Sequence, residues 1–346
     1  MAAIAAPWPA AVGVSGGGDS VALMLLLASW AKADGKPGPT VLTVDHGLRP
    51  ESHKEAQAVQ KLAASASLKA HILEWKGAKP SADVEAGARA VRYTLMGRWC
   101  AENRMSALYV AHTQEDQAET FLLRLARGSG VDGLAGMQPV SPLPVPEFRD
   151  IVLVRPLLGF TREELRSFLK DRKVAWSDDP TNADTRFARA RVRAAWPELI
   201  ELGLTPPRIA DAAEHLARAR AALEGLTDDF LRRGVRFGED SAALDLLRLK
   251  MVPREVGLRA LAKALSQVSG EEYRPRFDSL ERLFDSIVRG TLGGGATLHG
   301  CIVAPARTGA QVFGTATITI TPESSRNVGE PAAPAPRKSE KGRTRH

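Results

Sequence analysis

The sequence predicts an α/β protein in which a doubly wound parallel sheet is followed by a smaller α-helical domain. Short apolar runs rich in β-branched residues recur at 12–14, 40–44, 70–73, 108–111 and 151–154. Helical stretches separate them at 52–66, 84–102 and 114–127. Such alternation favours parallel strands whose ligands bind at their carboxyl ends. From about Pro206 the pattern changes to helices alone, with apolar residues at helical spacing.

Four parts are expected along the chain. Residues 1–200 form the α/β domain, 206–290 the helical domain, 291–321 a small β segment and 322–346 a disordered tail. Short alternating stretches rich in Gly and Thr predict the β segment. The tail is predicted from its four prolines, several charges and lack of aromatic residues.

The composition indicates an ordinary globular protein, with 44% hydrophobic and 25% charged residues among 346. The two cysteines, Cys100 and Cys301, are too few for a disulfide framework or a CxxC site, which predicts a reducing, cytoplasmic compartment. The longest largely apolar run, residues 21–31, is too short to span a bilayer, and the apolar stretch 1–11 lacks the basic start of a signal peptide. No membrane partner is therefore expected.

The net charge of +7 is unevenly distributed, because the excess of basic residues lies outside 1–150 and 201–290. Localised positive charge is typical of a protein that binds a polyanion. A solvated basic surface without a partner is the alternative.

A glycine-rich loop stands between the first predicted strand and the first long apolar run. Gly16, Gly17 and Gly18 leave backbone N–H groups uncovered beside a helix N-terminus, which makes an anion cradle. The loop matches neither the pattern G-x-x-x-x-G-K-[ST] nor the dinucleotide pattern G-x-G-x-x-G. A glycine-rich structural turn is the alternative.

The stretch SGGGDS at residues 15–20 resembles the S-G-G-x-D-S loop of the PP-loop ATP pyrophosphatases, which share an adenine nucleotide α-hydrolase-like fold. Further motifs follow in the order VDHGLR, EAGARAVRY, LYVAHTQEDQAET, RGSGVDGLAGM, RPLL and WSDDPTN. In order and spacing they resemble the tRNA(Ile)-lysidine synthetases over roughly residues 10–195. The resemblance gives residues 1–200 the role of an ATP-binding catalytic domain and residues 206–290 that of a tRNA-contacting domain.

The resemblance also implies a site for ATP and Mg²⁺ around the glycine loop. Loop amides and serine hydroxyls grip the pyrophosphate part of ATP, and Asp19 holds Mg²⁺. Arg89 and Arg92 bind phosphate, and the residues after the second strand lie near adenine or ribose. The expected ATP-binding residues are Ser15, Gly16, Gly17, Gly18, Asp19, Ser20, Asp45, His46, Arg89 and Arg92. For His46, a structural role at the strand end is the alternative.

The expected catalytic residues are Asp19, His112, Asp116 and Glu119. His112, Asp116 and Glu119 are spaced i, i+4 and i+7, so they share one helix face near the carboxyl edge of the sheet. The two carboxylates suit an ammonium group or Mg²⁺ and could deprotonate an amine, and the imidazole could contact phosphate or relay a proton. An ion-paired, solvated helix face is the alternative.

The chain departs from the family pattern in two places. Thr113 stands where members commonly have a second histidine, and RFARARVR stands where they often read R-N-R. The basic character of the second stretch is kept, and it predicts an RNA-binding stripe. Its members are Arg186, Arg189, Arg191 and Arg193.

The resemblance implies that lysine is joined to C2 of the wobble cytidine of a CAU-anticodon tRNA(Ile) through an adenylated intermediate. The expected partners are therefore this tRNA, free L-lysine, ATP and Mg²⁺, and assembly into a homodimer is left open. Another PP-loop tRNA-modifying enzyme is one alternative. An RNA-binding protein with a vestigial ATP site is the other.

Overall fold

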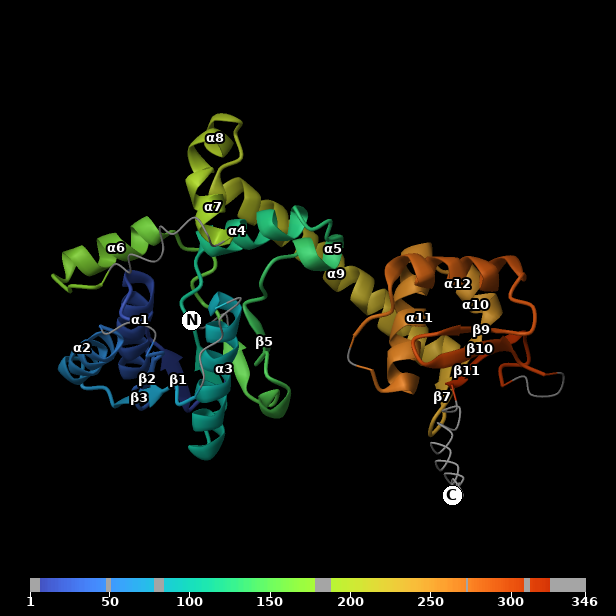
Figure 1. Cartoon of the computed structure of the whole chain (residues 1–346), viewed down its shortest axis with the longest axis horizontal. Helices are drawn as coiled ribbons and strands as arrows, with labels where there is room; N and C mark the ends of the chain where they lie inside the picture. Colours follow the sequence, from blue (N-terminus) through green and yellow to red (C-terminus); the bar gives the residue numbers. More distant parts are fainter. Residues whose placement is uncertain are drawn as a thin grey trace, which may run out of the picture. The chain divides into compact units, whose positions relative to one another are not determined.

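The computed structural model describes residues 7–47, 51–77, 84–177, 188–271, 273–307 and 312–323 (Figure 1). The chain divides into two compact units, residues 1–220 and 221–346. The boundary falls inside helix α9 (Pro206–Gly234), so this helix belongs in part to each unit. The two units are described separately.

The first unit is built on a six-stranded sheet with the order β3-β2-β1-β4-β6-β5. The strands are β1 (Ala10–Gly13), β2 (Thr40–Asp45), β3 (Ala70–Glu74), β4 (Ala107–Tyr109), β5 (Val140–Pro142) and β6 (Val152–Val154). All neighbouring strands pair in parallel except the edge strand β5, which runs antiparallel to β6. Because the chain continues from β1 to β2 on one side and places β4 on the other, β1 and β4 flank a topological switch point. Ligands of such sheets bind at the carboxyl ends of the strands there.

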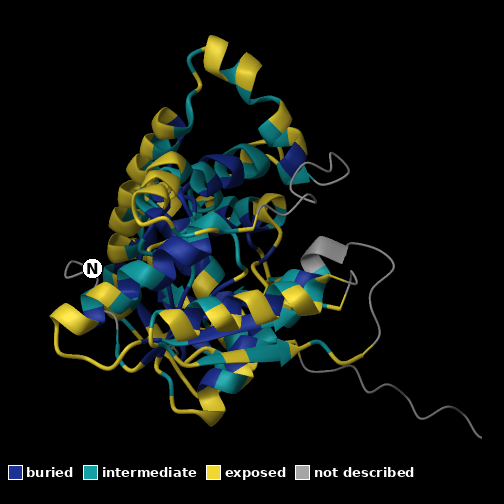
Figure 2. Ribbon diagram, turned by 90° about the vertical axis from the view of Figure 1, so that its left-hand side faces the viewer, coloured by how far each residue is buried: buried dark blue, intermediate teal, exposed yellow. Residues whose placement is uncertain are grey.

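The helices of the first unit are α1 (Gly18–Ala33), α2 (Ser52–Ser65), α3 (Val84–Glu102), α4 (Gln114–Leu125), α5 (Val131–Leu134), α6 (Arg162–Asp171), α7 (Ala188–Ala194), α8 (Trp196–Glu201) and the 3₁₀ turn η1 (Pro146–Phe148), besides the start of α9. Successive residues of a strand point to opposite sheet faces. Val12 therefore packs in a core with α1, α2 and α6, whereas Ala11 packs in a second core with α3. Figure 2 shows buried residues gathered in the sheet and on the inner sides of the helices.

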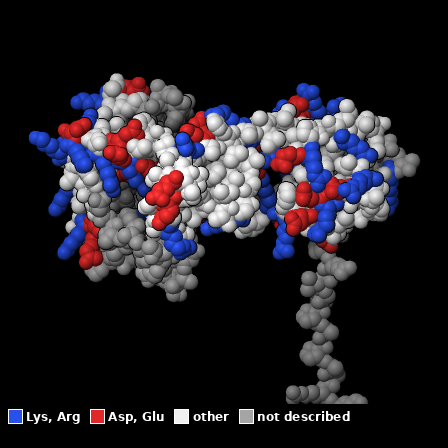
Figure 3. Space-filling model, turned by 90° about the horizontal axis from the view of Figure 1, so that it is seen from above, with Lys and Arg blue, Asp and Glu red and all other residues white. Residues whose placement is uncertain are grey.

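The second unit contains a five-stranded antiparallel sheet with the order β7-β8-β11-β10-β9. Its strands are β7 (Val235–Phe237), β8 (Ala242–Asp245), β9 (Ala296–Leu298), β10 (Cys301–Pro305) and β11 (Thr317–Pro322). Its remaining helices are α10 (Leu246–Met251), α11 (Arg254–Ser269) and α12 (Phe277–Arg289). Figure 3 shows basic and acidic side chains intermixed on the visible face of this unit.

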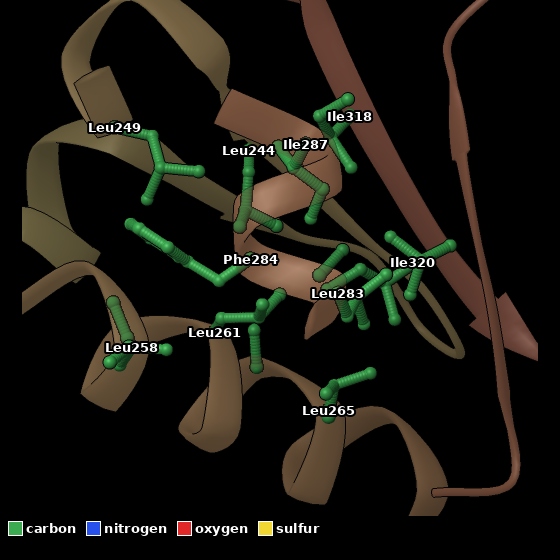
Figure 4. Close-up of a cluster of buried hydrophobic side chains, with 14 of the residues drawn as sticks. Leu244, Leu249, Leu258, Leu261, Leu265, Leu283, Phe284, Ile287, Ile318 and Ile320 are labelled. Atoms are coloured by element: carbon green, nitrogen blue, oxygen red, sulfur yellow. The ribbon is translucent and has the colours of Figure 1, made fainter. Parts of the chain in front are cut away.

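One apolar core joins the helices and the sheet of the second unit (Figure 4). Leu280, Leu283, Phe284 and Ile287 are buried at i, i+3, i+4 and i+7 of α12, which gives this helix a single apolar stripe. They belong to the same core as residues of α11 and of strands β8 and β11.

The α/β prediction for the first part of the chain is confirmed, since all five predicted strands are present in the sheet. The expected division of the remainder was wrong in two respects. Residues 206–290 are not purely helical, because β7 and β8 lie within them. The β segment predicted at 291–321 is not a separate part, because β11 pairs with β8. Residues 324–346, most of the predicted tail, lie outside the described residues.

No helix in the part of the chain that the structure describes combines the length and the apolar character needed to cross a membrane.

Candidate active site

The glycine loop connects β1 to α1 at the switch point. Gly16 has a φ of +93°, a conformation that side chains rarely adopt, and Gly17 is the N-cap of α1. The Ser20 hydroxyl donates to the Gly17 carbonyl at 2.8 Å and accepts from the Ser15 amide at 3.2 Å. The two serine hydroxyls lie 3.3 Å apart. Both predicted serines therefore face the loop, beside the exposed amides of a helix N-terminus.

A later segment of the chain closes over this loop. The Ser177 amide donates to the Gly16 carbonyl at 3.0 Å. A Cβ atom at Gly18 would lie 3.4 Å from the Trp176 ring. This contact ties the start of the WSDDPTN motif to the glycine loop, and residues 178–182 of that motif lie outside the described residues.

Asp116 stabilises the beginning of α4. Its Oδ2 accepts from the Thr113 amide at 2.9 Å and from the Thr113 hydroxyl at 3.2 Å, as part of a capping box. This accounts for threonine at the position where a histidine was expected. The neighbouring Arg162 guanidinium and the Thr113 amide help to hold the pKa of the Asp116 carboxyl below its usual range, against the effect of burial.

Arg162, the first residue of α6, joins the glycine loop to α4. Its Nη2 lies 2.7 Å from Asp116 Oδ1, its Nη1 3.2 Å from Glu119 Oε1 and its Nε 3.5 Å from Asp19 Oδ2. Its main-chain N–H donates to the Glu115 carboxylate at 3.0 Å. The three predicted acidic residues are thus brought together by an arginine that the sequence analysis did not single out.

Two of the four predicted RNA-binding arginines also contact these acids. Arg193 holds both oxygens of the fully buried Glu119, with Nε–Oε1 at 2.7 Å and Nη2–Oε2 at 3.2 Å. Arg189 Nη1 lies 3.8 Å from Asp116 Oδ1. Arg191 is exposed, and Arg186 lies outside the described residues. The predicted RNA-binding stripe is therefore divided, with two members turned toward the acidic side chains of α4.

His112 is held in its neutral form. Burial, together with the positive charges of Arg89, Arg155 and Arg189, lowers the pKa of the imidazole to about 3 despite the opposing effect of Asp116. Its Nδ1 atom is buried and has no hydrogen-bond partner among the described residues. A neutral ring forms no ion pair, and its buried nitrogen needs a hydrogen-bond partner that the described residues do not supply.

Asp19 differs electrostatically from the other acids. Burial and the charges of Asp116 and Glu115 raise the pKa of its carboxyl to about 6, although Arg162 opposes this shift. No cluster of three or more His, Cys, Asp or Glu side chains suited to a metal occurs in the described part of the chain. Mg²⁺ commonly binds one or two carboxylates together with substrate phosphates, so Asp19 alone fits a shared ion.

Among the remaining predicted ATP residues, Asp45 is used locally at the end of β2. Its carboxylate accepts from the Gly47 amide at 2.9 Å and lies 3.1 Å from His53 Nδ1. The His46 ring packs edge-on against Trp75. On α3, the Arg89 guanidinium lies over the Tyr93 ring at 5.1 Å.

Another member of this predicted ATP set is Arg92, which is exposed on the same helix as Arg89.

The glycine-rich segment after α4 is fastened to that helix. Gln117 exchanges two hydrogen bonds with the main chain of Met137, at 2.7 and 2.9 Å. Arg124 donates to the carbonyls of Gly133 and Gly136 at 2.7 and 3.0 Å. Gly136 has a φ of +66°, and a Cβ atom there would lie 2.8 Å from Gln117 Oε1. The main chain of this segment therefore lies close to the protein's own α4.

A glycine loop that opens on a helix N-terminus at the switch point of a parallel sheet is the architecture of a PP-loop domain. The family model described as the PP-loop domain matches residues 7–199. A relative from Ruegeria pomeroyi is 42% identical over 266 residues, which cover 77% of this chain and 62% of the relative. A relative from Bradyrhizobium sp. is 40% identical over 303 residues, which cover 84% of this chain and 83% of the relative. Both relatives are named tRNA(Ile)-lysidine synthase, and the chain belongs to the tRNA(Ile)-lysidine synthase family.

The resemblance expected from the motifs is thereby confirmed. The chain spans less than two thirds of the length of the Ruegeria pomeroyi relative. Among solved structures, the U34-tRNA thiolase NcsA from Methanococcus maripaludis matches with a TM-score of 0.50 and 18% identity. This match covers 60% of this chain and 71% of that chain, and it shows a shared fold.

Proposed function

We propose that this chain ligates lysine to C2 of the wobble cytidine, position 34, of a tRNA(Ile) with a CAU anticodon. In the first step the C2 oxygen attacks the α-phosphate of ATP, an O–P bond forms, and the α–β anhydride breaks to release pyrophosphate. In the second step the lysine ε-amine attacks C2, a C–N bond forms, and AMP leaves as the C–O bond breaks and the amine loses its proton. The product, lysidine, changes decoding from AUG to AUA.

The observation that carries this proposal is the bridge that Arg162 makes between the glycine loop and α4. The Arg162 guanidinium contacts Asp19, beside the glycine loop, as well as Asp116 and Glu119 on α4. The three carboxylates therefore lie close together. A two-step ligation needs this arrangement, because the activated base must meet the incoming amine without leaving the site. Family membership supports the same activity.

The loop main chain and the two serines receive the pyrophosphate part of ATP. Glycines at residues 16–18 let the phosphates approach the amides closely, and the partial positive charge of the α1 N-terminus favours them. Asp19 is the residue that would hold Mg²⁺ against these phosphates. When bound, the ion offsets negative charge on the leaving pyrophosphate.

The acids of α4 serve as charge partners in this proposal. Arginines contact both Asp116 and Glu119, so the two carboxylates suit a cation. The lowered pKa of Asp116 makes this carboxylate a weak proton acceptor. We assign them to hold the lysine amine close to C2. Neutral His112 directly precedes the N-cap of the same helix, and we assign it to position the substrate.

The target base must leave the anticodon stack to reach the α-phosphate. Among the described arginines of the basic stretch, Arg191 on α7 is exposed. We assign it to contact phosphates of the RNA backbone. A thiolation activity gains no support from the cysteines. Cys100 and Cys301 are both buried, and burial raises the pKa of the Cys100 thiol to about 12, so that the reactive thiolate is disfavoured.

The proposal is tested by incubating the protein with ATP, Mg²⁺, radiolabelled lysine and a transcript of the CAU-anticodon tRNA(Ile). Label retained on acid-precipitated RNA, together with equal amounts of AMP and pyrophosphate, is the expected result. A tRNA(Met) transcript, which carries the same anticodon, is the control and should stay unlabelled. AMP without lysine transfer would make lysine the wrong nucleophile, and tight RNA binding without AMP would favour a binding protein.

A further inference from the structure

Arg162 occupies the place where a cationic substrate group would bind. The carboxylates of Asp116 and Glu119 are the acceptors that suit the lysine amine, and the Arg162 guanidinium already lies 2.7 and 3.2 Å from them. Asp116 Oδ2 accepts from Thr113, and Oδ1 accepts from the Arg162 guanidinium at 2.7 Å. A substrate ammonium group at Oδ1 would therefore compete with this guanidinium.

Of the arginines at this cluster, Arg162 is the one suited to leave. Arg193 contacts both oxygens of the buried Glu119, so its departure would strand a buried charge. Arg162 spreads its guanidinium over three acids, with one nitrogen directed at each. Its weakest contact, at 3.5 Å, is with Asp19.

The direction in which Arg162 can move follows from its contact with Asp19. Asp19 lies in the first turn of α1, next to the loop amides that face a bound phosphate. A guanidinium binds phosphate oxygens in the same forked geometry in which it binds carboxylates. Nucleotide in the loop therefore offers Arg162 an alternative partner close to its present position.

The anchoring of Arg162 allows its side chain to move while the main chain stays fixed. Its amide is held by Glu115 at 3.0 Å, and Thr161 and Glu164 form a capping box around the start of α6. The side chain is about three quarters buried, with 23% of its surface exposed. A swing of the guanidinium thus requires no rearrangement of α6.

We propose that the Arg162 guanidinium occupies the binding site of the lysine amine at Asp116 and Glu119 until a bound nucleotide phosphate attracts it away. Lysine binding at Asp116 and Glu119 then depends on nucleotide, which keeps the amine out until the base can be activated. This inference rests on the proposed function, and it assigns Arg162 a gating role.

The test is equilibrium dialysis of radiolabelled lysine against the whole chain. It is carried out with tRNA(Ile) transcript, with and without α,β-methylene-ATP, an analogue that resists cleavage between the α and β phosphates. The wild-type protein is expected to bind lysine on the order of tenfold more tightly with the analogue, within the range typical of coupled sites. In Arg162→Gln the affinity without nucleotide should rise to the nucleotide-bound level. Arg162→Lys, which keeps a cation, should restore the nucleotide dependence.

Arg98→Gln, which removes an exposed arginine from α3, is the matched control and should behave as wild type. Equal lysine affinity of the wild-type protein with and without the analogue would overturn the proposal, and this result needs no variant. An unchanged nucleotide dependence in a folded Arg162→Gln protein would also overturn it. Release of pyrophosphate from ATP in the presence of tRNA alone, measured on the same preparations, reports separately on the proposed function.

Discussion

His112 should make the first unit less stable as the pH falls from 7 to 5. The pKa of the imidazole is lowered from 6.5 to about 3 in the folded protein, whereas the unfolded chain protonates this ring below about 6.5. Between these values the unfolded state binds more protons, so the free energy of unfolding decreases as the pH falls. At about 1.4 kcal/mol per pH unit, and with partial protonation near 6.5 included, the loss between pH 7 and 5 is up to about 2 kcal/mol.

Urea unfolding followed by tryptophan fluorescence measures this loss in the appropriate unit. All six tryptophans, at positions 8, 30, 75, 99, 176 and 196, lie within residues 1–220. In His112→Gln the titrating ring is absent, so the variant should lose up to about 2 kcal/mol less than the wild-type protein between pH 7 and 5. His215→Gln, which removes an exposed histidine from the same unit, should follow the wild type. Parallel losses in wild type and His112→Gln would refute the reasoning.

Three further results are expected. Gly128→Ala should destabilise the first unit by about 1–2 kcal/mol, because the φ of Gly128 is +73° while the space around it is open. Gly136→Ala should destabilise the unit more, because its new Cβ atom would also clash with Gln117. Equal shifts of the urea midpoint in the two variants would contradict this ranking. Asp116→Asn should retain tRNA binding in a filter assay while lysine transfer is lost, since the charge opposite Arg162 is removed, and a parallel loss of tRNA affinity would show a different role. The affinity for tRNA should fall steeply with salt, with a log–log slope of roughly −0.7 to −0.9 per phosphate contact, and a salt-independent affinity would exclude phosphate recognition.

The sheet of the first unit was predictable because most of its parallel strands are largely buried and read as continuous apolar runs. Ala107–Tyr109 is short, but it stands between the helical patterns at 84–102 and 114–127. Strands β5, β7 and β8 escaped prediction because they are only three or four residues long, and β5 and β7 are also largely exposed. Strand β7 pairs with the next strand, β8, and β5 pairs with β6, but no alternating apolar pattern marks these short segments in the sequence.

The pairing of the two acids could also be predicted, because their i, i+3 spacing places Asp116 and Glu119 on one face of α4. His112 was expected on the same helix face, but it precedes the N-cap Thr113 and does not lie on the helix. The pairing of Arg162 with these acids could not be predicted, since it joins residues 43 and 46 positions apart in the chain. TREE at 161–164 marks a helix start with a capping box, but it says nothing of where the arginine side chain points. For the same reason Arg193 could be read as basic but not as the partner of Glu119.

The measurement that tests the account most directly follows the α-phosphate of ATP. The protein is mixed with ATP labelled at the α-phosphate and the CAU-anticodon tRNA(Ile) transcript, first without lysine, and lysine with excess unlabelled ATP is then added. Label should accumulate on the RNA in the first stage and leave as AMP in the second, as lysine becomes attached. Lysine attachment without any earlier labelling of the RNA, or RNA-bound label that lysine fails to release, would contradict activation of the base by adenylation.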